Sequence, residues 1–166
     1  MKLAHGIHAM LVTPFTAGYQ LNEEASRKEV RWALDNGANG IVATPSIDEF
    51  LHLSEAERTR AFEVTLQEIR KRPGGVPATA MTSDAATLET LHYARIAATM
   101  GYDAQRVIAP YYWRCGEEAL GHLGTIKVTA SVATGIDMGP ARPPYMAPAD
   151  AVERLRKRLP QLREIL

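Results

Sequence analysis

Short apolar segments alternate with longer helix-like segments over most of the chain, and this alternation is the feature that most limits the possible fold. Segments typical of buried strands begin near residues 6, 40, 76 and 104, and a helical pattern follows each of them. Parallel strands joined by helices have this order, because crossover connections within one sheet are right-handed. The sequence therefore predicts an α/β fold with four parallel strand–helix units.

The boundaries of these units follow from local signals. Asn36 and Gly37 are expected to end the first helix, because glycine readily adopts the left-handed conformation of a helix cap. Ser54 and Glu57 have the spacing of a capping box at the start of the second helix. In the first helix, Val30, Trp32 and Leu34 are expected to form the apolar stripe. The predicted strands are about 5–12, 40–44, 76–81 and 104–109, and the predicted helices are about 22–35, 54–71, 87–100 and 117–123.

The regular alternation ends after residue 124. Residues 126–134 favour a strand by their β-branched content and a helix by their alanine content. Helices are expected at about 150–159 and 161–166, and no clear fifth buried strand is predicted. We therefore expect a single domain, 1–166, with strand–helix units in residues 1–124 and a carboxy-terminal helical segment in residues 125–166.

Length and charge exclude several classes of protein. A complete barrel of eight strand–helix units needs roughly 200 or more residues, and this chain has 166. The 19 Lys and Arg balance the 19 Asp and Glu, without the basic clusters that bind nucleic acid. No apolar run approaches the length of a membrane span, and the amino terminus does not resemble a signal peptide. A single cysteine, Cys115, excludes an internal disulfide and favours a cytoplasmic location.

The sequence also predicts neither a metal site nor a bound cofactor. The five histidines do not have the spacing of metal ligands, and one cysteine cannot complete a zinc site. Glycine-rich phosphate-binding motifs are absent from the sequence, which argues against a nucleotide.

Four stretches in the first 124 residues resemble one enzyme family. Together, their order and spacing resemble the dihydrodipicolinate synthase/N-acetylneuraminate lyase family of class I aldolases. Residues from about 126 onward resemble the extreme carboxy-terminal segment of the same family. The amino-terminal stretches read Gly-Ile-His-Ala-Met-Leu-Val-Thr-Pro-Phe at 6–15, Gly-Ala-Asn-Gly-Ile-Val at 37–42, Leu-Ser-Glu-Ala-Glu-Arg at 53–58 and Pro-Tyr-Tyr at 110–112.

The resemblance implies an incomplete TIM-barrel-like fold with carboxy-terminal helices. Members of the family are barrels that make or cleave carbon–carbon bonds of pyruvate-derived ketoacids through a lysine Schiff base. The sixth strand carries that lysine and the fifth carries a proton-relay tyrosine. The stretch that would carry the fifth to eighth strands is not found in this sequence.

The loop after the second strand is the expected substrate-binding loop. In the family it reads Gly-Thr-Thr-Gly-Glu and binds the ketoacid carboxylate through hydroxyls and backbone amides. The matched positions here are Pro-Ser-Ile-Asp-Glu at 45–49. The resemblance makes Ser46 and Ile47 the candidate substrate-binding residues. Pro45 cannot donate an amide hydrogen bond, and Asp48 adds negative charge where a carboxylate is expected.

Tyr112 and Lys127 are the residues to compare with the family's proton-relay tyrosine and Schiff-base lysine. Tyr112 matches the second tyrosine of the family's Pro-Tyr-Tyr motif, which relays protons and reaches a neighbouring subunit's site, so it is the candidate catalytic residue. An interfacial aromatic is the alternative interpretation. Among five lysines, Lys127 alone resembles a strand lysine, but it follows Tyr112 too closely for another strand and helix to intervene.

These observations give two hypotheses of function. The first is a member of this family, related to pyruvate-dependent lyases and inactive alone because the Schiff-base lysine is missing. The second is a non-catalytic half-barrel that self-associates or binds a small ketoacid such as pyruvate. Four units would leave sheet edges and one apolar face uncovered, so we expect a homo-oligomer with Tyr111, Tyr112 and Trp113 near an interface.

Overall fold

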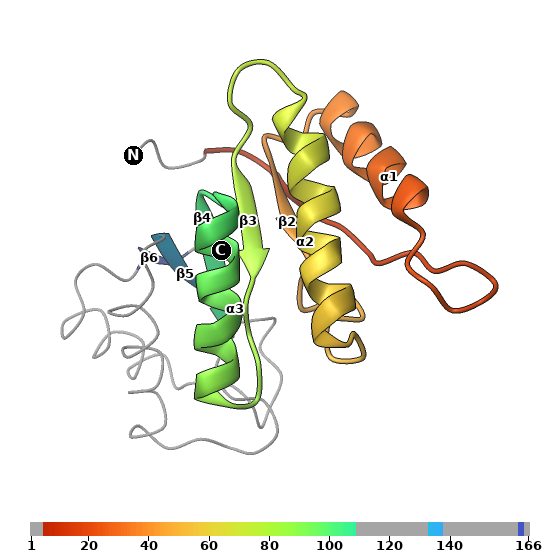
Figure 1. Ribbon diagram of the computed structural model, residues 1–166. Coiled ribbons are helices and arrows are strands. Elements are labelled where there is room, and N and C mark those ends of the chain that lie inside the picture. Colours follow the sequence, from red (N-terminus) through yellow and green to blue (C-terminus); the bar gives the residue numbers. More distant parts are fainter. Residues whose placement is uncertain (1–4, 109–132, 138–162, 165–166) are drawn as a thin grey trace. The chain divides into compact units, whose positions relative to one another are not determined.

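Strands and helices alternate along the part of the chain that the structure describes, as the sequence predicts (Figure 1). The computed structural model describes residues 5–108, 133–137 and 163–164. Two compact units are present. The first contains residues up to Met81 together with Met100–Asp103, and the second contains Thr82–Thr99 and residues from Ala104 onward.

Three parallel strands form the sheet of the first unit. They are β1 (His8–Met10), β2 (Gly40–Ala43) and β3 (Ala78–Met81), and β2 pairs with both of the others. Every residue of β2 and β3 is buried, which is expected of parallel strands covered on both faces. Two helices, α1 (Glu23–Asp35) and α2 (Glu55–Arg70), lie side by side in this unit (Figure 1).

Helix α1 begins and ends close to where its sequence predicts. The Asn22 side chain accepts a hydrogen bond from the Ala25 amide at 3.1 Å, and Gly37 has a φ of 94° just beyond the last turn. The expected apolar stripe is wrong at one position, because Trp32 is 68% exposed while Val30 is fully buried. Residues two apart lie about 200° apart around a helix, so Val30 and Trp32 cannot share a face.

Helix α2 confirms the predicted capping box. The Ser54 hydroxyl accepts from the Glu57 amide at 3.3 Å, and the Glu57 carboxylate accepts from the Ser54 amide at 2.9 Å. The hydroxyl of Ser54 also donates to this carboxylate, and these bonds lower the pKa of Glu57. Farther along α2, the Phe62 carbonyl accepts a 2.8 Å hydrogen bond from the Tyr102 hydroxyl.

The Gly-Ala-Asn-Gly stretch at 37–40, which leads into β2, contacts the start of β1. The Asn39 side chain accepts from the Ile7 amide at 2.9 Å, immediately before β1 begins. Gly40 faces the His8 ring so closely that a Cβ on it would lie 2.6 Å from a ring atom. A glycine at position 40 therefore allows the backbone of β2 to approach β1.

The second unit contains most of α3 (Thr87–Met100) and three more strands. Strand β4 (Ala104–Ile108) pairs in parallel with β5 (Ala133–Asp137), which pairs in parallel with β6 (Arg163–Glu164). Strand β5 lies at the end of the stretch 126–134, for which the sequence left strand and helix open, and extends beyond it to residue 137. The helix expected over 161–166 is wrong at residues 163–164. Strand β5 contains a glycine and an aspartate, which have low strand propensity, and it forms through backbone pairing with β4.

Several predictions fall outside the described residues. They are the helix at 117–123, Tyr112, Lys127, the aromatic residues 111–113 and the helix at 150–159. The single-domain division at residue 124 also stays a prediction. Among the helices that the structure describes, none has the length and apolar content needed to cross a membrane.

Candidate functional site

The loops after β1 and β2 lie at the same edge of the first unit's sheet. Both strands run in parallel, with Met10 paired to Val42, so their carboxyl ends are adjacent. In open and closed α/β sheets this edge is where ligands bind. Polar groups follow Met10 and Ala43 at this edge.

A hydrogen-bonded pair joins these two loops. The Thr13 amide donates to Asp48 Oδ1 at 2.6 Å, and the Thr13 hydroxyl donates to Asp48 Oδ2. Thr13 is only 9% exposed, so water has little access to these bonds. Both oxygens of one carboxylate are thus held by two donors of a single residue.

A second carboxylate lies beside this pair. Glu29, on α1, accepts a 3.0 Å hydrogen bond from the Val12 amide through Oε1. Its other oxygen, Oε2, is buried and has no hydrogen-bond partner among the described residues. Burial, and then the negative charge of Asp48, raise the pKa of Glu29, although the Val12 amide acts in the opposite direction. The edge therefore carries two close carboxylates.

The residue that ends β2 has an unusual backbone. Thr44 has a φ of 44°, which is rare for a β-branched side chain and costs energy. Its side chain is 4% exposed, and its hydroxyl has no hydrogen-bond partner within the described part of the chain. Strained backbone of this kind is concentrated at functional sites.

The two predicted substrate-binding residues lie in the same loop as Asp48. Both side chains are exposed, Ile47 at 68%. They form the centre of a turn in which the Asp48 amide donates to the Pro45 carbonyl at 3.0 Å. The structure therefore brings Ser46 and Ile47 to the strand edge, and their role in binding stays a prediction.

Arg58, on α2, is a positioning residue that the sequence interpretation did not single out. It is 1% exposed, and its guanidinium donates to the Met81 carbonyl at the end of β3 at 2.8 Å. The same guanidinium lies 5.0 Å from the centroid of the Phe50 ring. Arg58 thus connects the loop after β2 to the end of β3, and the only signal for it was its place in the Ser-Glu-Ala-Glu-Arg stretch.

In the second unit, the two residues that follow β3 are buried, and their side chains form hydrogen bonds to β4. Thr82 and Ser83 are fully buried. The Thr82 hydroxyl donates to Gln105 Oε1 at 2.8 Å, and the Ser83 hydroxyl accepts from the Ile108 amide at 2.8 Å. Both hydroxyls thus form hydrogen bonds to β4 within this unit.

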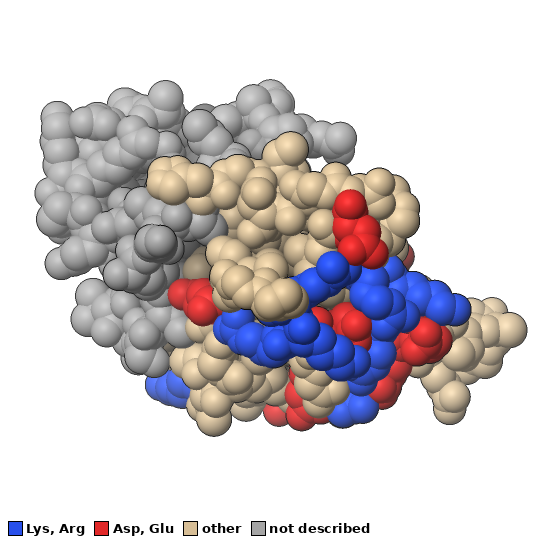
Figure 2. Space-filling view, turned by 90° about the horizontal axis from the view of Figure 1, so that it is seen from above, with Lys and Arg blue, Asp and Glu red and all other residues tan. Residues whose placement is uncertain are grey.

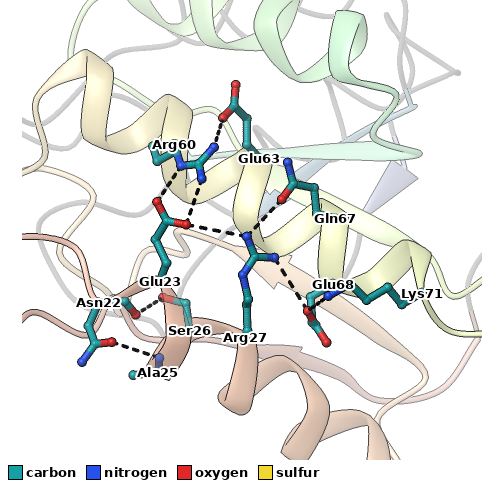
Figure 3. Close-up of polar contacts among 10 residues, drawn as sticks. All are labelled: Asn22, Glu23, Ala25, Ser26, Arg27, Arg60, Glu63, Gln67, Glu68 and Lys71. Carbon is teal, nitrogen blue, oxygen red and sulfur yellow. Dashed lines mark hydrogen bonds and ion pairs between the residues drawn. The ribbon is translucent and has the colours of Figure 1, made fainter.

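The outer surface of α1 and α2 carries a network of ion pairs, drawn in Figure 3. Arg60 holds both oxygens of Glu23, with Nε to Oε1 at 2.7 Å, and Arg27 joins Glu23 and Glu68. Lys71 donates to Glu68 at 2.7 Å. Figure 2 shows Lys and Arg side chains in a continuous band, with Asp and Glu side chains beside and within it. The surface therefore has the character of a solvated, paired helix face.

A groove of about 810 Å³ lies on the same helices. It is lined by Arg27, Leu66, Arg70, Lys71 and Met100, among others. The three cations already have partners, because Arg70 pairs with Asp103 at 3.0 Å and the other two contact Glu68. No group of three metal-ligating side chains is present in the described ranges. The strand edge with Thr13 and Asp48 is thus the stronger candidate site.

The fold and its strand-edge loops define the class of protein as part of a parallel α/β barrel. The sequence profile of the Dihydrodipicolinate synthetase family matches residues 3–158, so the chain belongs to that family. The sequence is 36% identical over 115 residues to 4-hydroxy-tetrahydrodipicolinate synthase from Syntrophus aciditrophicus, covering 69% of this chain and 38% of the relative.

Solved structures share the fold of this chain. Dihydrodipicolinate synthase DapA-2 from Bacillus anthracis matches 95% of this chain and 53% of its own, with a TM-score of 0.85 and 25% identity. The chloride-inhibited dihydrodipicolinate synthase from Acinetobacter baumannii, solved with pyruvate, has a TM-score of 0.85 at 24% identity, covering 99% of this chain and 54% of its own. The chain therefore spans roughly half the length of these relatives.

Proposed function

We propose that this chain is part of a pyruvate-dependent carbon–carbon lyase or aldolase, and that it does not carry out the family's reaction by itself. The observation that carries the proposal is the family match together with the half-length coverage. The family reaction needs a lysine amine that forms an imine with the ketoacid. Such an amine requires an apolar setting or another cation nearby to lower its pKa.

The described lysines support the absence of such an amine. Lys28 has a 70% exposed side chain and lies 4.0 Å from Glu24. Lys71 has a 62% exposed side chain and donates to Glu68 at 2.7 Å. Neither amine lies in the apolar setting, or beside the second cation, that a Schiff-base lysine requires. Lys127 lies outside the described residues, and its close spacing to Tyr112 argues against a sixth-strand position.

Borohydride trapping tests this proposal. The chain is incubated with pyruvate and sodium borohydride, and lysine adducts are mapped by peptide mass spectrometry. We expect no reduced pyruvate adduct on any lysine, while a full-length family enzyme treated in parallel is labelled. An adduct on Lys127 would overturn the proposal and would identify this chain as a Schiff-base enzyme.

The second candidate function is a non-catalytic half-barrel that self-associates or binds a small ketoacid. Exposed apolar side chains favour it, because Val12, Tyr19, Ile47 and Leu51 in the two strand-edge loops are 52–87% exposed. An accumulation of such side chains is typical of an interaction surface. A cytoplasmic location and a proton-relay role for Tyr112 also stay proposals.

A further inference from the structure

Two consecutive backbone amides after β1 donate to carboxylates of the chain itself. The Val12 amide donates to Glu29 at 3.0 Å, and the Thr13 amide donates to Asp48 at 2.6 Å. The Thr13 hydroxyl adds a third donor, which also binds Asp48. Hydrogen bonds from backbone N–H groups to carboxylates are charge-assisted and stronger than those between neutral groups. This segment of backbone is therefore suited to carboxylates.

The carboxylate of Asp48 reaches Thr13 from a distant part of the sequence. The two residues are 35 positions apart, and a turn from Pro45 to Asp48 presents the aspartate. Thr44, which precedes the turn, contributes a buried hydroxyl without a hydrogen-bond partner among the described residues. Unsatisfied buried polar groups are uncommon in native proteins, and this one lies at the carboxyl end of β2, next to the turn that presents Asp48.

We propose that Thr13 is a binding residue for a small carboxylate anion, and that Asp48 is an internal carboxylate that occupies the same position. The amide and the hydroxyl of Thr13 each bind a different oxygen of one carboxylate, which is the recognition that a free carboxylate would need. The identity of the external ligand, a small ketoacid, rests on the proposed function, whereas the carboxylate chemistry does not.

Competition from Asp48 explains why such a ligand would bind poorly. A group tethered by a short turn has an effective concentration of millimolar or more at its own binding position. A free carboxylate at lower concentration cannot displace it. The negative charge of Glu29, next to Asp48, adds repulsion against a second anion. Position 48 therefore determines whether the Thr13 donors are accessible.

The test removes the internal carboxylate and measures binding of acetate and of pyruvate separately. Amide chemical shifts of Val12 and Thr13 are followed by NMR at constant ionic strength in the wild type and in Asp48→Ala. We expect saturable shifts at Thr13 in Asp48→Ala, with an affinity at least about tenfold higher than in the wild type. Glu63→Ala is the control, since Glu63 is a carboxylate on α2, outside both strand-edge loops, that pairs with Arg60. It is expected to behave as the wild type.

Two further variants keep the inference open to refutation. Thr13→Val in the Asp48→Ala background removes the hydroxyl and should reverse most of the gain. If Asp48→Ala does not fold, Asp48→Gly takes its place, because it also removes the side chain from the Thr13 donors and glycine is favoured at the last position of such a turn. Equal affinities in the wild type and in the folded position-48 variant overturn the inference.

The two proposals fail separately. A borohydride adduct in the wild type overturns the proposed function and leaves the gain at Thr13 unaffected. Acetate and pyruvate binding in Asp48→Ala without any adduct supports both proposals. Shifts spread over the surface, with none larger at Thr13, count against a site at this residue.

Discussion

At the scale of single residues, the strand edge contains one carboxylate with hydrogen bonds to both oxygens and one carboxylate with a buried oxygen that lacks a partner among the described residues. Asp48 has two donors from Thr13, whereas Glu29 has one donor and one buried oxygen without a partner among the described residues. An unsatisfied buried oxygen on a charged group opposes folding, because it loses hydration without a replacement. The ionised Glu29 side chain is thus expected to lower the stability of the native chain.

We predict that Glu29→Gln stabilises the chain at neutral pH. The Gln carbonyl oxygen can still accept from Val12, and the charge beside Asp48 is removed. Because the Glu29 side chain is partly exposed, solvent screening limits the gain to roughly 0.5 kcal/mol. Urea unfolding at pH 7 measures it, and a variant less stable than the wild type contradicts the prediction.

The pH dependence of this variant has a definite sign. The folded-state pKa of Glu29 is raised above 4.5, so the native state binds the proton more tightly than the unfolded state. The wild type therefore loses stability as pH rises from about 4.5 through the folded pKa, and Glu29→Gln lacks this loss. Glu89→Gln, an exposed control on α3, should keep the wild-type slope.

Arg58 is predicted to be among the most sensitive single positions. Its guanidinium is buried against the Phe50 ring and donates to the Met81 carbonyl. Arg58→Ala should lower the free energy of unfolding by about 3 kcal/mol, through a cavity and a carbonyl without its donor. Arg95→Ala, at an exposed position on α3, should change it by less than about 0.5 kcal/mol. Similar losses in both variants, measured by urea unfolding, would refute a special role for Arg58.

At the scale of helices, Glu68 of α2 forms ion pairs with Arg27 and Arg31 of α1. Its side chain is only 5% exposed, and it accepts from Arg31 at 3.0 Å and from Lys71 at 2.7 Å. Burial acts to raise the pKa of Glu68, but the hydrogen bonds from Lys71 and Arg31 outweigh it, so the pKa is lowered. The carboxylate therefore stabilises the packing of the two helices while it is ionised.

We predict that Glu68→Gln destabilises the chain at neutral pH and that the difference from the wild type shrinks in acid. A depressed folded pKa contributes stability above the unfolded value of about 4.5, and this contribution is lost as pH falls through the folded pKa. Thermal unfolding from pH 7 to pH 3 measures the difference. Glu63→Gln is the control, because Glu63 pairs with Arg60 alone on the same helix at a more exposed position. A constant difference at every pH would argue against the ionic contribution.

At the scale of the whole molecule, the apolar side chains of the strand-edge loops predict self-association. Ile47 is 68% exposed and Leu51 is 52% exposed. Burying such a side chain contributes about 1.5–3 kcal/mol, which favours an interface between copies. Analytical ultracentrifugation should show a dimer or larger species at micromolar concentration. Ile47→Asp should shift it toward monomer, whereas Leu88→Asp, at an exposed position on α3, should not. A compact monomer of the wild type would exclude this assembly.

Local sequence signals determined most of the helices and the order of the elements. Asn22, Gly37 and the Ser54–Glu57 box act within a few residues of their own backbone, so they could be found without a fold. The phrases that resemble the family also predicted the α/β class, which the family match and the solved structures confirm. Local patterns were less reliable for strands, because β1 covers only His8–Met10 of the expected 5–12.

Only the tertiary structure decided which side chains meet at the strand edge. Thr13 and Asp48 are 35 positions apart, and no local pattern indicates that one holds the other. The short strand β5 likewise depends on backbone pairing with β4, which its own composition does not favour. Trp32 is hydrophobic yet exposed, because its place on α1 puts it on the side away from Val30. The sequence alone predicted the elements and the family, because both depend on local patterns. Contacts between distant segments depend on how strands and helices pack, so only the fold determined the hydrogen bonds at the candidate site.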